Sequence, residues 1–462
     1  MKNILVTLFC ISILGCKSQQ KLISSGNNKI KLITLDPGHF HSALVQKVMY
    51  KEVDPVVQVY APDGPDLDQH LGRIKAYNTR PDDPTKWKEE VYTGNDFLEK
   101  MLIEKKGNVV VMAGNNQKKT EYIFKAINAG YNVLADKPMA IDKKNFELLK
   151  NAFEVAAQKN VLLYDIMTER YEITTVLQKE LSLLPQVFGQ LEKGTTENPA
   201  VTKESVHHFY KYVSGSILTR PPWFMDVTQE GEGIVDVTTH LVDLVQWECF
   251  PEKIIDYKKD IQLTSARRWT TDITSSQFDA LTKLNGSPSY LQKNVVNDSI
   301  LKVYSNGEIN YIINGVHAKV SVRWAYKAPE GAGDTHYSIM RGTKANLIIR
   351  QGAEQSYKPA LYIEPINAND VSYANVLTEQ LKSIQAKYPD VGIEKISQGW
   401  KVTIPEKYNE GHESHFARVT EKFLQYFKEG KLPAWEVPNM IAKYYTTTSA
   451  LEMALQTKNT TQ

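Results

Sequence analysis

The stretch that decides the fold is AGYNVLADKPMAI, residues 129–141. Its apolar run Val133-Leu134-Ala135 has no polar face, which is typical of a strand buried on both sides in a parallel sheet. Pro138 disfavours helical geometry at Lys137 and ends the strand there. Because open α/β sheets bind ligands at the carboxyl ends of their strands, Lys137 is a candidate site residue. A solvent-exposed lysine before a turn proline is the alternative that this stretch alone leaves open.

A second stretch, GEGIVDVTTHLVDLVQWECF, predicts a helix within residues 231–250. Four of its side chains recur at helical spacing and therefore share one stripe: Asp236, His240, Asp243 and Trp247. Apolar residues flank this stripe on both sides, which predicts that it is partly buried. Buried Asp and His side chains need partners, and such places are often functional sites. The alternative is an amphipathic helix with its polar face in water.

Together the two stretches resemble the Gfo/Idh/MocA family, the glucose–fructose oxidoreductase and inositol dehydrogenase group. Members typically end a strand with Glu-Lys-Pro, and this chain has Asp136-Lys137-Pro138, with Asp in place of Glu. Members later carry three glycines, then an Asp, a His and a second Asp at fixed spacing. The matching residues here are Gly231, Gly233, Asp236, His240 and Asp243. The resemblance implies an α/β protein that acts as an NAD(P)-dependent oxidoreductase.

The length of 462 residues suggests two domains. The resemblance implies a Rossmann-type doubly wound sheet in residues 30–165, followed by an α+β domain for substrate binding and oligomerisation in residues 166–462. Runs rich in β-branched and aromatic residues, such as 318–326 and 335–341, predict the large, mostly antiparallel, open-faced sheet of the second domain. By the same resemblance, we expect a homo-oligomer that forms through this sheet.

Residues 1–16 predict a lipoprotein signal peptide. Lys2 precedes an apolar run that is too short to span a bilayer, and Ile13-Leu14-Gly15-Cys16 resembles a bacterial lipobox. Polar residues 17–29 predict a tether. We expect a protein of the bacterial cell envelope, periplasmic or at the outer membrane, whose only membrane contact is a lipid on Cys16. A plain secretory signal cut near this point is the alternative.

The composition excludes some partners. A formal charge of +2 is spread along the chain without a basic block, so nothing indicates nucleic acid binding. Once the signal peptide is removed with Cys10, Cys249 is the only thiol besides Cys16, so no intramolecular disulfide is expected.

The predicted cofactor site begins at the first strand–helix turn. Dinucleotide-binding folds carry Gly-x-Gly-x-x-Gly there, so that backbone amides approach the pyrophosphate. The three positions here are Asp36, Gly38 and His41, and only the middle glycine is kept. His39 and His41 are candidate phosphate donors, although packing at the helix start would equally explain them.

Further along, Asp63 lies about 25 residues after Gly38, where an acid commonly binds the adenosine ribose. That position favours NAD over NADP, because a 2′-phosphate would meet a carboxylate; an ordinary turn Asp is the alternative. The resemblance implies a cofactor contact at Asn116. The predicted cofactor site comprises Asp36, Gly38, His39, His41, Asp63, Asn115, Asn116, Asp136, Lys137 and Pro138.

The candidate catalytic residues are Lys137, Asp236 and His240. Oxidation of an alcohol requires a base that removes the hydroxyl proton near neutral pH, which suits His240. Lys137 would stabilise the developing alkoxide, and Asp236 would hold a substrate hydroxyl or orient the imidazole. The resemblance implies the same roles. Predicted substrate contacts are Arg170, His207, Trp223, Asp236 and His336, for each of which a structural role is the alternative.

Histidine pairs raise the question of a metal. Adjacent side chains such as His207 and His208 diverge, and His412 and His415 have no carboxylate set at ligand spacing beyond Glu410 and Glu413. The sequence therefore predicts no metal site.

Three functions stay open, because NAD is not abundant outside the cytoplasm. In the first, the protein oxidises a sugar or glycoside and passes the electrons to a coupled acceptor. Alternatively, NAD stays tightly bound and is regenerated in each turnover, as in the oxidation–elimination–hydration–reduction route of glycosidase branches of the family. That route needs a second base, for which the candidates are Tyr171, His207, His336 and His412. The third function, suggested by the eroded glycine motif, is a non-catalytic surface protein that binds glycans without NAD.

Overall fold

The computed structural model describes residues 29–213, 216–330 and 332–457. The predicted signal peptide, the lipidated Cys16 and nearly all of the tether lie outside these residues, so they stay predictions. Within the described ranges, no helix combines the length and the apolar character needed to cross a membrane.

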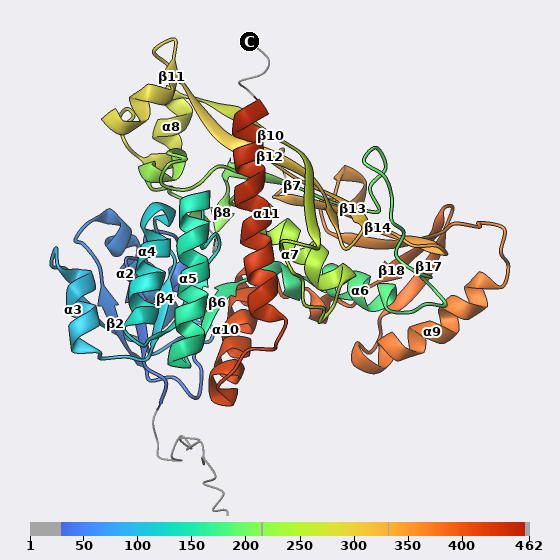
Figure 1. Ribbon diagram of the computed structural model, residues 1–462, viewed down its shortest axis with the longest axis horizontal. Coiled ribbons are helices and arrows are strands. Elements are labelled where there is room, and N and C mark those ends of the chain that lie inside the picture. Colours follow the sequence, from blue (N-terminus) through green and yellow to red (C-terminus); the bar gives the residue numbers. More distant parts are fainter. Residues whose placement is uncertain (1–28, 214–215, 331, 458–462) are drawn as a thin grey trace, which may run out of the picture.

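The first domain is built on a parallel six-stranded sheet in the order β3-β2-β1-β4-β5-β6 (Figure 1). The strand order reverses between β1 and β4, and in such folds this switch point is where ligands bind. The strands are β1 (Leu32–Leu35), β2 (Val56–Tyr60), β3 (Lys88–Tyr92), β4 (Val109–Met112), β5 (Asn132–Asp136) and β6 (Leu163–Ile166). The helices are α1 (His41–Leu44), α2 (Pro65–Thr79), α3 (Phe97–Glu104), α4 (Asn116–Asn128) and α5 (Lys143–Lys159). Strands β1, β4 and β5 are buried almost throughout, which explains why most of their residues are apolar.

Helix α2 occupies a segment whose polar sequence suggests an insertion into the fold. Pro65 stands at its first position, where proline is well tolerated. Leu67, His70 and Ile74 on one face are buried, while the remaining face is polar. Interpreting this segment as an insertion is therefore wrong: α2 is the regular crossover between β2 and β3.

The second domain is built on a large sheet in the order β10-β12-β13-β7-β14-β15-β16-β18-β17, with β11 paired to β12. Neighbouring strands are antiparallel, except for the parallel pair β13 and β7. The large strands are β7 (Val201–Tyr210), β10 (Ile261–Thr274), β12 (Ile300–Ile313), β13 (Val316–Lys327), β14 (Thr335–Arg341), β15 (Ala345–Arg350) and β16 (Ala360–Pro365). Shorter ones are β8 (Tyr212–Val213), β9 (Ser216–Ile217), β11 (Val295–Val296), β17 (Gly392–Ile396) and β18 (Gly399–Thr403). The predicted mostly antiparallel sheet is confirmed, whereas its use as an oligomer interface stays a prediction.

Helices cover this sheet and connect it to the first domain. They are α6 (Ile173–Ser182), α7 (Thr238–Cys249), α8 (Ser275–Thr282), α9 (Tyr373–Lys387), α10 (His412–Glu429) and α11 (Glu436–Thr457). Short 3₁₀ turns are η1 (Thr168–Tyr171), η2 (Pro222–Met225), η3 (Ser289–Asn294), η4 (Ala353–Gln355) and η5 (Glu406–Tyr408).

The end of the chain returns to the first domain. Phe416, Phe423 and Tyr444 belong to the same hydrophobic core as Leu32 and Val110 of the Rossmann sheet. Helix α11 runs between α5 of the first domain and α7 of the second (Figure 1). The boundary expected at residue 165 falls one residue before the end of β6 and stays a prediction, and the core of the first domain also includes side chains of these C-terminal helices.

A buried charge network joins the domains beside α11. The Arg170 guanidinium donates two hydrogen bonds of 2.7 Å to Asp243 and one of 2.8 Å to Glu436. The Lys443 ammonium lies 2.8 Å from Asp243 and 2.7 Å from Asp165. Although burial disfavours its charge, Arg170 and Lys443 hold the pKa of Asp243 well below its usual value. All members of this network are almost wholly buried.

Replacing Lys443 should therefore be costly. We expect Lys443→Met to lower the free energy of unfolding by about 3–5 kcal/mol, because it leaves the buried Asp165 carboxylate without a counter-charge and removes one of the two cations at Asp243. Lys143→Met is the matched control, since its ion pair with Glu452 is exposed, and it should change this free energy by less than about 1 kcal/mol. Urea unfolding of the three proteins measures the difference. Equal stability of both variants would contradict the importance of the network.

Candidate functional site

A cleft of about 1610 Å³ is lined by residues of both domains. It collects side chains from the carboxyl ends of β1 and β5, the start of α7, strand β7 and the connection between β13 and β14. Seven of the predicted catalytic, cofactor and substrate residues line it: His39, His41, Lys137, His207, Asp236, His240 and His336. The structure therefore brings Lys137 together with Asp236 and His240, which lie about a hundred residues later in the sequence.

Lys137 follows directly after β5 and is nearly buried. Its ammonium donates a hydrogen bond to the Asp236 carboxylate, so the end of β5 is tied to the turn before α7. Burial disfavours the charged lysine, but Asp236 and Asp136 outweigh this effect and raise the pKa of Lys137. Lys137 is thus a fixed cation in the wall of the cleft.

His240 lies in the first turn of α7, which begins at Thr238 rather than at residue 231. The preceding residues form turns, in which the Asp236 amide donates to the Glu232 carbonyl over 3.0 Å. His240 is only 8% exposed, and its Nδ1 atom has no hydrogen-bond partner. Burial lowers the pKa of His240 well below its usual value, and the charge of Lys137 lowers it further. The imidazole is therefore neutral.

The cleft also contains polar residues that the sequence did not single out as a group. Asp334, in the connection between β13 and β14, lies 3.2 Å from His207 and accepts hydrogen bonds from His208 and Lys211. Desolvation and the charge of Glu172 raise the pKa of Glu169 to about 7. The sequence gives no signal for Asp334, because it follows a glycine-containing turn that resembles any loop.

Two predicted substrate residues lie elsewhere. Arg170 is committed to Asp243 and Glu436 in the interdomain network and does not line the cleft. Trp223, in η2, donates from its indole to Asp66 over 2.8 Å and packs on Gly38. Neither side chain lines the cleft, and the sequence could not show the distant partner that each one contacts, so their role in substrate binding stays a prediction.

The first turn of the Rossmann domain departs from a phosphate cradle. The amides of Gly38 and His39 both donate to the Ala113 carbonyl, at 3.2 and 3.1 Å. Asp36 has a left-handed backbone, with φ of 46°, and accepts a hydrogen bond from the Tyr122 hydroxyl. Helix α1 has only four residues, so it contributes little helix dipole. The turn thus lacks two of the usual glycines, and its Gly38 and His39 amides already have a hydrogen-bond partner within the protein.

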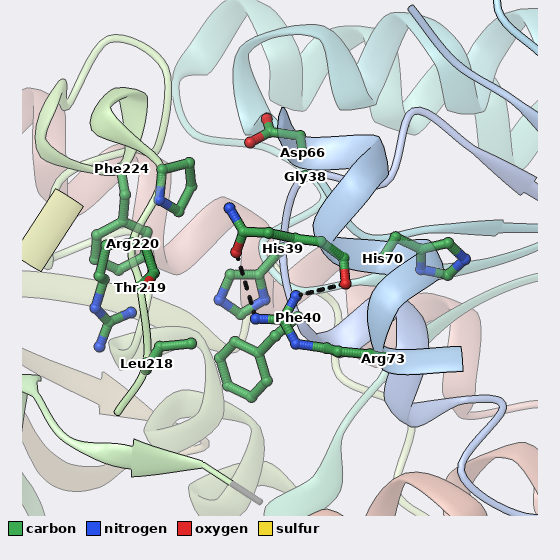
Figure 2. A pocket seen from close by; sticks show the side chains of 12 residues that line it. Gly38, His39, Phe40, Asp66, His70, Arg73, Leu218, Thr219, Arg220 and Phe224 are labelled. Atoms are coloured by element: carbon green, nitrogen blue, oxygen red, sulfur yellow. Dashed lines mark hydrogen bonds between the residues drawn. The ribbon is translucent and has the colours of Figure 1, made fainter. Parts of the chain in front are cut away.

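A segment of the second domain covers this turn. Figure 2 shows Arg220 and Phe224 of residues 218–224 facing Gly38 and His39, with Arg73 of α2 on the other side. The space left between them is about 10 Å³, roughly enough for one water molecule. Burial lowers the pKa of Arg220 to about 10. We call residues 218–224 the cover segment.

The predicted asparagines are also engaged by the second domain. Asn115 donates to the Gln229 side chain over 2.7 Å, and Asn116 donates to the Glu230 carbonyl over 2.7 Å. Asp63, in contrast, is exposed just after β2. The contacts of Asn115 and Asn116 and the cover segment thus fill the region around the turn where the resemblance would place a pyrophosphate. Lys137, by contrast, lines the open cleft.

Comparison with known proteins settles the family. Residues 66–165 match the family model described as "Oxidoreductase family, NAD-binding Rossmann fold". Residues 177–455 match the one described as "Putative oxidoreductase C terminal domain". The chain belongs to the Gfo/Idh/MocA oxidoreductases. As a member of this family it is an NAD-dependent oxidoreductase, and its cofactor is NAD.

Solved structures agree with this assignment. One described as "a putative oxidoreductase" from Parabacteroides merdae is 60% identical, with a TM-score of 0.91, and the match covers 93% of this chain and 98% of that one. Levoglucosan dehydrogenase in complex with NADH and levoglucosan is 12% identical, with a TM-score of 0.57 and coverage of 93% and 98%. GenD2 from gentamicin A biosynthesis, in complex with NAD, is 15% identical, with a TM-score of 0.55 and coverage of 93% and 95%. The last two share the fold. No curated protein matches the chain significantly.

The position of the cover segment leads us to predict that Trp223 affects the affinity of the protein for NAD. Trp223→Ala removes the indole that packs on Gly38, so opening this part of the cleft should cost less free energy. We expect the variant to bind NAD about threefold to tenfold more tightly, because more of the protein is competent to bind. Isothermal titration measures the affinity, with Trp269→Ala on β10 as the control. Weaker binding by the Trp223 variant would show instead that the indole contacts the cofactor.

Proposed function

We propose that this protein oxidises a hydroxyl group of a sugar or glycoside, with NAD as hydride acceptor and His240 as the general base. The observation that carries the proposal is the convergence of cationic Lys137, its partner Asp236 and neutral His240 in one wall of the cleft. Levoglucosan dehydrogenase has the same fold and has been solved with NADH and a sugar, which supports this choice of substrate class.

Each residue has a role that follows from its state. NAD, when bound, supplies the hydride acceptor. Neutral His240 takes the hydroxyl proton of the substrate. Lys137 uses one N–H on Asp236 and keeps two for the substrate oxygen, whose developing negative charge it stabilises. Asp236 thereby positions the ammonium and keeps it charged.

Other side chains suit a polyhydroxylated substrate. Trp324 is an aromatic surface in the cleft, and the His207 ring packs against it at 5.2 Å between centroids. Asp334 and His336 add an acceptor and a neutral imidazole, since burial lowers the pKa of His336 to about 3. Aromatic faces combined with hydrogen-bonding groups match the alternating apolar and hydroxyl faces of a sugar.

One observation favours glycoside cleavage by oxidation, elimination, hydration and reduction as a second candidate. Elimination needs another base near neutrality, and Glu169, whose pKa is raised to about 7, lines the same cleft. Of the bases suggested by the sequence, His207, His336 and His412 line the cleft, whereas Tyr171 does not.

An assay on the purified protein separates these functions. With an aryl glycoside and no added cofactor, release of the phenol indicates the glycosidase route. Formation of NADH only after NAD is added indicates simple oxidation. Mass spectrometry of the denatured protein shows whether NAD is carried along. No turnover in either assay, together with no NAD released, would leave glycan binding as the function.

The variants His240→Ala and Lys137→Ala test the assigned roles in whichever assay shows turnover. Each should lower kcat by at least about a hundredfold, the scale of one acid–base or oxyanion contribution. His317→Ala on β13, outside the cleft lining, serves as the control and should keep full activity. Near-normal turnover of either catalytic variant, with melting temperature unchanged, would refute its role.

A further inference from the structure

Two histidines and a carboxylate converge at the turn after β1, where His41 takes one of the glycine positions of a Rossmann turn. His39 and His41 come from the turn after β1, and Asp136 ends the neighbouring β5. The Nδ1 atom of His41 is 2.8 Å from the Asp136 Oδ2 atom, and that of His39 is 3.5 Å from the same oxygen. The three potential ligand atoms all lie within 4.8 Å of one another.

Hydrogen bonding explains only part of this cluster. His41 and Asp136 form a good hydrogen bond, whereas the Nδ1 atom of His39 is shielded from solvent and has no hydrogen-bond partner. The two imidazole rings are nearly perpendicular, with centroids 4.0 Å apart, so they approach the carboxylate from different directions. Buried polar atoms normally have partners, so the orphaned nitrogen points to a ligand between the three side chains.

Nearby ammonium groups do not satisfy the Asp136 carboxylate. Lys137 is paired with Asp236. Lys119 donates to Asn116 and to the backbone carbonyls of Asp136 and Pro138, not to the Asp136 side chain. The carboxylate is therefore available to a cation, and two neutral imidazoles beside it complete a metal-binding donor set.

We propose that His39, His41 and Asp136 bind one divalent transition-metal ion of the zinc type. Two imidazoles and a carboxylate are a donor set that zinc and related ions use, often with a further position open. Ligand atoms around tetrahedral zinc are about 3.3 Å apart, since each bond is about 2.0–2.1 Å. The separations of 2.8 and 3.5 Å differ from this value by only a few tenths of an ångström.

The ion would serve the cleft. His39 and His41 both line it, so the remaining coordination positions would be open to water or to an oxygen of a bound ligand. This proposal departs from the sequence-based prediction that the chain has no metal site. It also gives a reason why His41 takes a glycine position of the turn. The inference does not depend on the proposed oxidation, because metal binding is measured directly.

Cobalt titration of the full-length protein, after removal of metals with a chelator, tests the site. We expect one Co²⁺ per chain, with the visible d–d absorption of a low-coordinate imidazole site. Asp136→Asn keeps the side-chain shape and the hydrogen bond from His41, while His39→Asn removes the orphaned imidazole. Each variant should weaken Co²⁺ binding at least about a hundredfold, since even outer-shell changes at metal sites cost tenfold to a hundredfold.

His415→Asn is the matched control, because it removes another buried histidine outside the cluster and should leave the cobalt spectrum unchanged. Zn²⁺ should also raise the melting temperature of the wild-type protein but not that of the Asp136 variant. Melting without metal shows that each variant is folded. An absent absorption band in the wild-type protein, or an undiminished band in folded Asp136→Asn, would overturn the proposal.

Discussion

The ion pair between Lys137 and Asp236 is the interaction on which the site depends. It joins the end of a Rossmann strand to the turn before α7, so an ammonium and a carboxylate from different domains are held together in the wall of the cleft. Because both partners are almost buried, neither charge is tolerable without the other. Burial lowers the pKa of His240, and the charge of Lys137 lowers it further. The ion pair thus contributes both to the position of the site residues and to the neutral state of the imidazole.

Patterns of neighbouring residues in the sequence were sufficient to predict individual strands and helices. The apolar run before Lys137 specified a buried strand, and the helix predicted within residues 231–250 is present from Thr238, with Asp236 in the turn before it. What could not be inferred were contacts between distant segments. Arg170 has the chemistry of a substrate ligand, but Asp243 and Glu436 satisfy it from elsewhere in the chain. A single sequence shows which residue is present but not which distant residue it contacts.

The Rossmann turn shows the same limit in another form. The sequence shows that glycines are missing, but only the structure shows which contacts take their place. His41 takes a glycine position and bonds to Asp136, while the neighbouring amides turn to Ala113. The residues that close over this turn come from a segment nearly two hundred residues later. Loss of the motif therefore reflects a rebuilt site, with new side chains in place of backbone donors.

The return of the last helices to the first domain has a consequence for biosynthesis. The Rossmann core lacks Phe416, Phe423 and Tyr444 until nearly the whole polypeptide has emerged. An N-terminal unit of an ordinary two-domain protein can fold during synthesis, before its neighbour is made. Here the earliest strands must wait for the end of the chain, and such non-local closure slows folding. A polypeptide whose first domain is completed by its last helices therefore acquires its final shape only when its synthesis is finished.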